Sequence, residues 1–384
     1  MLRQNKTKNF SKRVGLDIGS HSIKAVEVVE RGAEIVVRSA GAVALPIIEH
    51  NRDSIDNDSI VQALKTLWAK AKFKSNQVVL ALSPESVYTK WLHLEAPDRE
   101  ALDATARAAA ARGAPFPPED AVTDYRVLSS RGTFSKNVHF VMLIAASASA
   151  IDALLDIVDA AGLDPLAVDI GAAAALRCFD AHKRASGLLW SGQPVAHCVI
   201  GARTTTISVM RSGELEFART VPVGGNDFTE CIANYCGITW PEAEKIKTMP
   251  SSRLVEGGNL ITSHDNQELR IPCEAVLGRL TREIQRSLRF FSSQFAEGSY
   301  LGMIGATTLS GGASLMKGLD TCLEEQGVDI AGVINPFAGL SVDAEAGVQR
   351  IGETAAQYSI AMGLALGDYW SSEIGPATET ELAA

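Results

Sequence analysis

The chain has 384 residues, enough for two domains or for one larger fold with two lobes. Hydrophobic residues make up 46% of it, so a large core can form without disulfides. A net charge of −9 argues against general nucleic-acid binding, which needs a basic surface. The six cysteines form no CxxC pair, which disfavours a structural zinc site, and no run of 18 apolar residues could cross a membrane.

Strands and turns alternate at the beginning of the chain. The stretches RVGLDIG and IKAVEVVE predict two strands, and IVVRSAGAVAL after the turn RGAE predicts a third, so that an antiparallel meander forms. A helix follows at 57–72, where apolar residues recur at helical spacing, and NQVVLALSP then predicts a buried strand. We assign 1–12 to a disordered basic tail and 13–95 to a first lobe.

Residues 96–168 differ in character and predict a small α+β subdomain inserted into the first lobe. DREALDATARAAAARG predicts an alanine-rich helix that ends at a glycine- and proline-rich cluster, and TDYRVLSS and NVHFVMLIAAS predict strands. A helix at 148–161 and a strand at DPLAVDIG close the segment. We expect the first lobe to be completed by about 169–190 and 335–370.

The opening pattern returns in PVAHCVIGARTTTISVMRSGELEFARTVPVGG. Alignment of Ile18-Gly19 with Ile200-Gly201 places LDIGSHSIKAVEV over CVIGARTTTISVM, about 180 residues later. This distance indicates the duplication of a domain rather than a short repeat. Two such units that face each other would form a cleft, so we expect a second lobe at 191–334.

The second lobe is predicted to contain more helix than the first. GNDFTECIANYCGI, TWPEAEKIKTM and 274–296 have helical patterns, and the polar segment 250–270 between them is interpreted as loop. YLGMIGATTLSGGASLMKGLDTCLEEQG predicts a strand, a glycine-rich turn and a helix that begins near Leu315. The polar end of the chain, 371–384, has no basic amphipathic face of the kind that lies on membranes.

The turn of the first hairpin has the residue types of an anion site. Gly19 lets the backbone approach a ligand closely, and the turn amides with the hydroxyls of Ser20 and Ser22 can donate to phosphate oxygens. Asp17 is placed to hold Mg²⁺ through water. Lys24 faces either the phosphates or the solvent, and a polar hairpin without a ligand is the alternative interpretation.

Two later loops have related chemistry. The second loop contains Gly201, Arg203, Thr204 and Thr205, and the third contains Gly311, Gly312 and Ser314. In the second, the arginine would add a charge-assisted contact to phosphate. In the third, bare backbone before a helix could accept a flat ring or a ribose near the helix-end amides. Three such loops in order on a duplicated scaffold predict a nucleotide site.

The three loops and the residues around them resemble those of a known superfamily. GLDIGSHSIKAVEV, IGARTTTISV and LSGGASLMKGL resemble the two phosphate motifs and the adenosine motif of the actin-like ATPase superfamily. From about Val14 to Gly367 the chain resembles the PilM family of type IV pilus assembly proteins, relatives of the cell-division protein FtsA. The resemblance implies an α/β fold, a duplicated actin-like (ribonuclease H-like) fold of two lobes with an inserted small α+β subdomain, and ATP with Mg²⁺ between the lobes.

The resemblance also implies residue roles. Phosphate and Mg²⁺ would meet Asp17, Gly19, Ser20 and Ser22 from the first lobe and Gly201, Thr204 and Thr205 from the second. Adenosine would lie between Gly311, Gly312 and Ser314, with Glu244 and Lys247 near the ribose or base. The superfamily usually has an aspartate where this chain has Val199. We therefore expect ATP binding with little or no hydrolysis, because positioning and metal electrostatics supply most of the catalysis of phosphoryl transfer.

The family's function implies a cytoplasmic scaffold at the cytoplasmic face of the inner membrane. It would dock the cytoplasmic tail of a single-pass partner, PilN, as an extended peptide in a groove between the core and the inserted subdomain, and it could self-associate. Two alternatives remain open. One is an FtsA-like filament protein of cell division, which the polar end of the chain disfavours. The other is a small-molecule kinase on the same fold, with Asp169 or Asp227 as the base.

Overall fold

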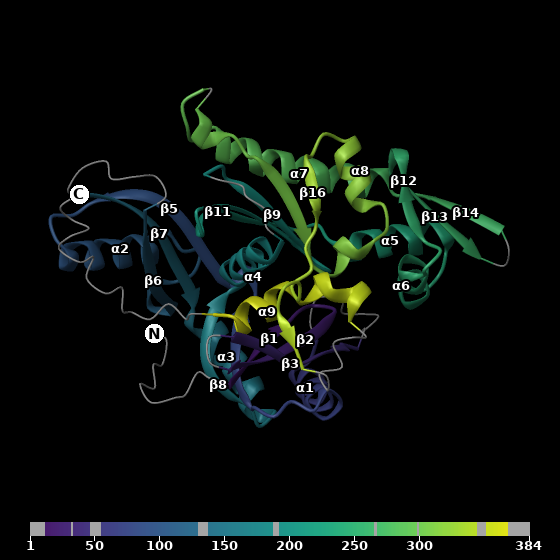
Figure 1. Ribbon diagram of the computed structural model, residues 1–384, viewed down its shortest axis with the longest axis horizontal. Helices are drawn as coiled ribbons and strands as arrows, with labels where there is room; N and C mark the ends of the chain where they lie inside the picture. Colours follow the sequence, from purple (N-terminus) through teal and green to yellow (C-terminus); the bar gives the residue numbers. More distant parts are fainter. Residues whose placement is uncertain are drawn as a thin grey trace.

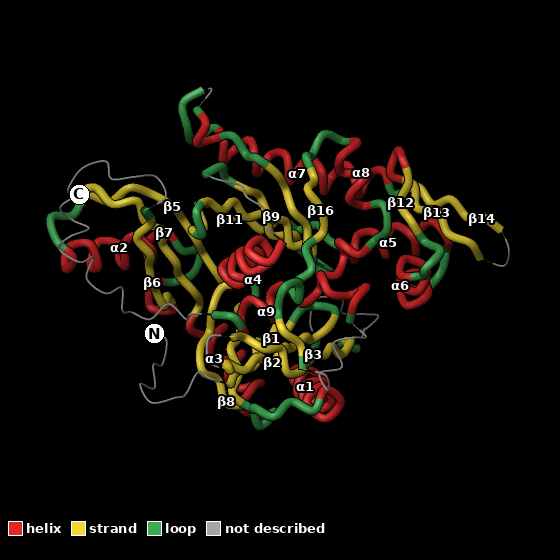
Figure 2. Tube along the Cα trace, in the orientation of Figure 1, coloured by secondary structure: helices red, strands yellow, loops and turns green. Residues whose placement is uncertain are grey.

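The protein forms two lobes on either side of a shared cleft (Figures 1 and 2). The computed structural model describes residues 12–31, 34–46, 55–129, 137–186, 192–264, 267–297, 299–343 and 351–367. The tails predicted at 1–12 and 371–384 lie outside these residues, apart from Lys12, which begins the first strand. Among the described residues, no helix is both long enough and apolar enough to cross a membrane.

The first lobe is built on a six-stranded sheet with the order β17-β3-β2-β1-β4-β8. Its strands are β1 (Lys12–Ile18), β2 (Ser22–Arg31), β3 (Glu34–Ala44), β4 (Gln77–Leu82), β8 (Asp164–Ile170) and β17 (Ser341–Val342). The first three form the predicted antiparallel meander. Helices α1 (Asn57–Ala71) and α3 (Ala148–Ala160) cover one face, and α4 (Gly171–Ser186) and α9 (Ser359–Ala365) cover the other.

The second lobe repeats the meander in a five-stranded sheet with the order β11-β10-β9-β15-β16. Its strands are β9 (Val195–Ile200), β10 (Thr205–Arg211), β11 (Glu214–Val221), β15 (Ala306–Ser310) and β16 (Ile330–Val333). Its helices are α5 (Gly225–Cys236), α6 (Trp240–Thr248), α7 (Glu274–Ser292) and α8 (Leu319–Glu325). Since the helix after the third loop follows Gly318, whose φ is +80°, it begins later than predicted.

The inserted subdomain is a three-stranded sheet with one helix packed on it. Its elements are β5 (Val87–Glu95), β6 (Ala121–Leu128), β7 (Val138–Ser147) and α2 (Arg99–Gly113). Both of its ends differ from the expected segment 96–168. β5 pairs with β7 and so belongs to this sheet, whereas α3 and β8 pack into the first lobe.

The interpretation of 250–270 as loop was wrong. This segment forms most of a separate sheet of β12 (Arg253–Val255), β13 (Asn259–His264) and β14 (Gln267–Pro272). Leu254 and Leu260 pair across β12 and β13, Leu260 pairs with Ile271, and all three are buried in the helix-covered core of the second lobe. Each strand supplies so few buried positions that the polar residues between them hide the alternation.

Helices α4 and α9 cross at the junction of the lobes at very short distance. A Cβ added at Gly363 on α9 would lie 1.8 Å from the backbone oxygen of Ala174 on α4. Strand β1 packs equally closely on α9, since a Cβ added at Gly15 would lie 1.9 Å from the backbone oxygen of Ala361. The Arg177 side chain on α4 donates to the Gly363 backbone oxygen over 2.8 Å. One continuous core cluster includes residues of both sheets and of these two helices.

A buried polar chain connects the second sheet to α9. His197 on β9 is fully buried, and its two ring nitrogens contact the hydroxyls of Thr308 at 2.8 Å and Ser310 at 2.9 Å. The Ser310 hydroxyl in turn donates to Ser359 on α9 over 3.0 Å. Burial lowers the pKa of His197 from 6.5 to about 3, so the ring is neutral in the folded protein.

We predict that Gly363→Ala destabilises the protein severely. The new methyl group has no room beside the Ala174 carbonyl, so the helices must separate, at a cost on the order of 3 kcal/mol in the free energy of unfolding. Urea unfolding monitored by circular dichroism measures this loss. The matched control is Gly352→Ala, where nothing lies within 4 Å of the added Cβ, and equal stabilities of the two variants would contradict the close packing.

We also predict a histidine-dependent loss of stability in mild acid. The unfolded chain takes up this proton near pH 6.5 and the folded chain only near 3, so the contribution is fully present above 6.5 and falls as the pH drops toward 3. Between about pH 7.5 and about pH 5 the wild type should lose about 2 kcal/mol more than His197→Gln. His139→Gln, on β7, is the control and should follow the wild type; a parallel curve for His197→Gln would refute the assignment.

Candidate functional site

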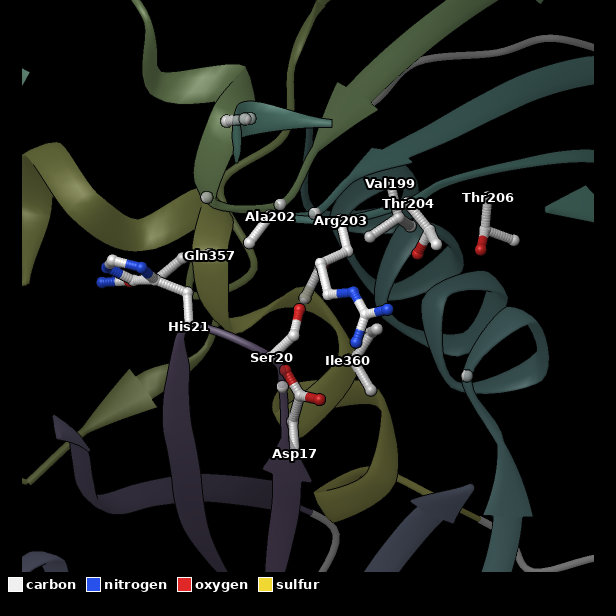
Figure 3. Close-up of a pocket in the computed structure, with 18 of the residues that line it drawn as sticks. Asp17, Ser20, His21, Val199, Ala202, Arg203, Thr204, Thr206, Gln357 and Ile360 are labelled. Atoms are coloured by element: carbon white, nitrogen blue, oxygen red, sulfur yellow. The ribbon is translucent and has the colours of Figure 1, made fainter. Parts of the chain in front are cut away.

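A cleft of about 1060 Å³ lies between the two lobes. Most residues predicted from the sequence line it, namely Asp17, Gly19, Ser20, Ser22, Lys24, Gly201, Arg203, Thr204, Glu244, Lys247, Gly311 and Gly312. Two predicted residues, Thr205 and Ser314, are not among those that line it. Figure 3 shows Asp17 and Ser20 from the first lobe and Arg203 from the second directed into the same space.

The two hairpin turns have the same backbone geometry. The Gly19 amide donates to the Ser22 carbonyl over 3.2 Å, and the Gly201 amide donates to the Thr204 carbonyl over 2.9 Å. A side chain at either glycine would crowd the turn, because a Cβ at Gly201 would lie 3.0 Å from the Thr204 oxygen. The duplication seen in the sequence therefore places two glycine turns on opposite walls of one cleft.

Side chains differ between the turns. In the first lobe Asp17 and Lys24 lie opposite each other on β1 and β2, and their side chains form an ion pair of 3.3 Å. The Lys24 ammonium also donates to the Ser22 carbonyl over 3.2 Å, so both contacts hold it at the first turn, where it lines the cleft. At the same positions of the second lobe stand Val199 and Thr206, which carry no charge.

The register of β10 corrects the prediction for Thr205. Its side chain is fully buried and its hydroxyl donates to the Val223 carbonyl over 2.7 Å, away from the cleft. Thr206, the next residue, lines the cleft instead, because successive side chains of a strand point to opposite faces. The sequence alignment of the two repeats could have identified Thr206, because it places Thr206 at the position of Lys24.

The third loop meets the cleft with its backbone. Gly311 has a φ of +91°, and a Cβ there would lie 2.4 Å from the Ile200 carbonyl, so only glycine fits. Nothing lies within 4 Å of a Cβ at Gly312, which leaves an open face of peptide toward the cavity. The Ser314 hydroxyl donates to the Gly311 carbonyl over 2.7 Å, so this residue stabilises the loop. Contrary to the prediction, it does not line the cleft.

Glu244 and Lys247 on α6 form one corner of the cleft. Their side chains pair at 2.7 Å, and the Thr229 hydroxyl on α5 donates to Glu244 over 2.6 Å. The Lys247 ammonium also donates to the Gly225 carbonyl over 3.1 Å. Burial lowers the pKa of Lys247, whereas the carboxylate of Glu244 acts in the opposite direction. This network fixes the corner independently of any ligand.

Sequence reasoning missed Asn226. This residue lines the cleft beside the second turn, and its backbone amide donates to the Ala202 carbonyl over 2.7 Å. Its side-chain oxygen is buried and has no hydrogen-bond partner among the described residues. A buried acceptor without a partner is costly, so it favours a ligand that brings a donor. Its position two residues after Gly224 gave no pattern to recognise.

The two aspartates considered as kinase bases are engaged elsewhere. Asp169 pairs with Arg177, and Asp227 accepts the Gly224 amide over 2.7 Å and pairs with Arg279. Neither residue is among those that line the cleft. Within the described part of the chain, no group of three histidine, cysteine, aspartate or glutamate side chains could hold a metal ion.

Comparison with known proteins gives a family. The family model described as type IV pilus assembly protein PilM matches residues 15–369. A solved structure of a PilM-PilN type IV pilus biogenesis complex is 24% identical, with a TM-score of 0.74, and the match covers 92% of this chain and 97% of that chain.

A second solved structure, the ethanolamine utilization protein EutJ from Carboxydothermus hydrogenoformans, is 15% identical, with a TM-score of 0.51. That match covers 92% of this chain and 89% of that chain. At such identities the likeness concerns the fold, and it confirms the predicted α/β actin-like architecture.

Proposed function

This chain belongs to the family of type IV pilus assembly proteins PilM, and we propose that it binds ATP with Mg²⁺ between its lobes as a cytoplasmic scaffold of pilus assembly. The observation that supports nucleotide binding most strongly is the pair of equivalent glycine turns on opposite walls of one cleft. Turns of this kind present backbone amides to phosphate oxygens. The open peptide at Gly312 leaves space for the flat base.

The remaining residues of the cleft fit the same ligand. Arg203 would meet phosphate from the second lobe, and the Thr204 and Ser20 hydroxyls lie at the two turns. The unpartnered Asn226 oxygen would accept a hydrogen bond from a ligand donor. Asp17 would hold Mg²⁺ through water, and the metal would supply charge neutralisation of the phosphates.

We propose that turnover is slow. Val199 and Thr206 replace the ion pair of the first lobe, so the second turn offers no carboxylate to position a metal or a water, and Glu244 of the same lobe is paired with Lys247. Asp169 and Asp227 are both paired, and neither lines the cleft, so neither is placed to act as a general base. The cleft therefore suits a nucleotide that is bound without being hydrolysed rapidly, as a nucleotide-dependent scaffold requires.

ATP with Mg²⁺ should stabilise the protein against thermal unfolding, by about 2.7 kcal/mol at 100 times its Kd.

Asp17→Asn should lower the affinity for ATP measured with Mg²⁺ but not the affinity measured in excess EDTA, because the carboxylate serves the metal. Isothermal titration calorimetry measures both. The control is Asp152→Asn on the exposed surface of α3. Absence of any ATP effect would refute nucleotide binding, and Mg²⁺-dependent hydrolysis that Asp17→Asn abolishes would refute slow turnover.

The tail of a PilN-like partner would dock where the cleft reaches the inserted subdomain. Val87, Tyr88 and Thr89 of β5 line this part of the cleft, and Ala218 of β11 faces it. β5 and β11 are edge strands of their sheets, joined by the Trp91 indole, which donates to the Leu215 carbonyl over 2.7 Å. Edge strands offer unpaired backbone groups to an extended peptide.

Two neighbouring residues of β5 test this groove. Thr89 lines the cleft, whereas Lys90 is exposed and does not line it. Thr89→Trp should weaken binding of a synthetic peptide of the partner's cytoplasmic tail at least about tenfold by filling the groove, and Lys90→Trp should not. Fluorescence anisotropy gives both affinities. Equal affinities for the two variants would exclude this groove, and the ATP-induced stabilisation of each variant checks that it is folded.

A further inference from the structure

α7 presents a row of arginines on its outer face. The row consists of Arg279, Arg282, Arg286 and Arg289. Intervals of three and four residues place these side chains on one side of the helix, and all of them are exposed. The opposite side of the helix is buried in the core of the second lobe. In Figure 1, α7 lies along the upper margin of the molecule.

Half of this charge is not neutralised among the described residues, because only Arg279, which pairs with Asp227, and Arg286 have an acidic partner. Among the described residues, Arg282 and Arg289 form no ion pair. Arg286, with a side chain that is 67% exposed, lies 4.0 Å from Glu283, which also pairs with Arg219 at 3.5 Å. The face therefore remains cationic on a chain whose net charge is −9.

Exposed apolar side chains lie at the C-terminal end of the same helix. They are Phe290 (56% exposed), Tyr300 (51%), Leu301 (41%) and Met303 (55%). The short helix η4 (Tyr300–Gly302) packs against this end of α7, where the Ser292 hydroxyl donates to the Gly302 carbonyl over 2.7 Å. Glu297, in the connecting loop, is exposed and opposes the arginines with one charge.

We propose that this arginine face, defined by Arg282, Arg286, Arg289, Phe290 and η4, docks on an anionic phospholipid bilayer. The guanidinium groups would meet lipid phosphates, to which arginine can donate two parallel hydrogen bonds. The aromatic and aliphatic side chains at the end of α7 would enter the headgroup region, as those of interfacial helices do. A net acidic chain is repelled by such a surface, so a local cationic face such as this one favours the approach.

A bilayer fits this face better than an acidic protein does. The arginines from Arg282 to Arg289 extend over about 10 Å of a convex helix. Apolar anchors of protein interfaces sit in pockets of the partner or in grooves, and the described cleft has no lining residue on α7. A lipid surface requires only charge and exposed apolar tips close together, and α7 and the adjoining η4 supply both.

Vesicle sedimentation with the full chain tests the proposal. The protein should bind vesicles of phosphatidylcholine with phosphatidylglycerol, should not bind phosphatidylcholine alone, and should be released by high salt. The triple variant R282Q/R286Q/R289Q should bind on the order of 100-fold more weakly, because each basic residue near an anionic surface contributes about a factor of five. Phe290→Ser with Met303→Ser should weaken the binding that persists at intermediate salt.

The control removes the same charge elsewhere. K65Q/K70Q/R99Q changes exposed residues of α1 and α2 and should bind like the parent. No binding of the parent to anionic vesicles, or equal binding of both triple variants, would overturn the proposal. So would binding to soluble polyglutamate without binding to vesicles, which would indicate an acidic protein partner. The assay contains neither nucleotide nor partner peptide, so its failure leaves the proposed scaffold function unaffected.

Discussion

The close crossing of α4 and α9 is the constraint on which the two-lobed arrangement depends. It requires Gly363 on α9 to have no side chain beside the Ala174 carbonyl on α4. Helix α9 also packs closely on β1, where Gly15 has no side chain beside Ala361. This packing also affects the cleft, because α9 begins at Ser359, which lines the cleft. Ala356 lies just before α9, and its carbonyl accepts a hydrogen bond from the Gly311 amide of the third loop over 2.9 Å. Packing at the junction of the lobes therefore positions both the floor of the cleft and its third loop.

The two duplicated turns of the cleft have the same backbone geometry but differ in the charge of their side chains. The turn itself needs a glycine and one backbone hydrogen bond, so the side chains at the neighbouring strand positions are free to vary. One copy has the Asp17–Lys24 ion pair, and the other has Val199 and Thr206. Because the backbone of the turn is independent of these side chains, the second copy can lack a carboxylate and still keep the turn that we propose holds phosphate.

Local patterns of glycines and apolar residues were sufficient to predict the meander, its copy and the order of the three loops. The errors came from features that depend on partners. Thr205 and Thr206 are indistinguishable until the strand register assigns each to a face. The roles of β5 and β8 depend on which sheet each strand joins, and no residue within either strand decides that. Ser314 satisfies a carbonyl of its own loop, a contact that exists only once Gly311 adopts its positive φ.

Charge within the cleft indicates how an anionic ligand would be held. Lys24 is balanced by Asp17 and Lys247 by Glu244, so two of the cleft's ammonium groups contribute little net positive charge. A bound triphosphate would then depend mainly on backbone amides of the two turns and on Arg203. Amide donors are fixed by the fold and lose no side-chain entropy on binding, whereas freeing Lys24 would leave Asp17 unpaired at 14% exposure. Metal binding at Asp17 offers the compensation, because a cation at that carboxylate would release Lys24 toward the phosphates without leaving a buried charge unpaired.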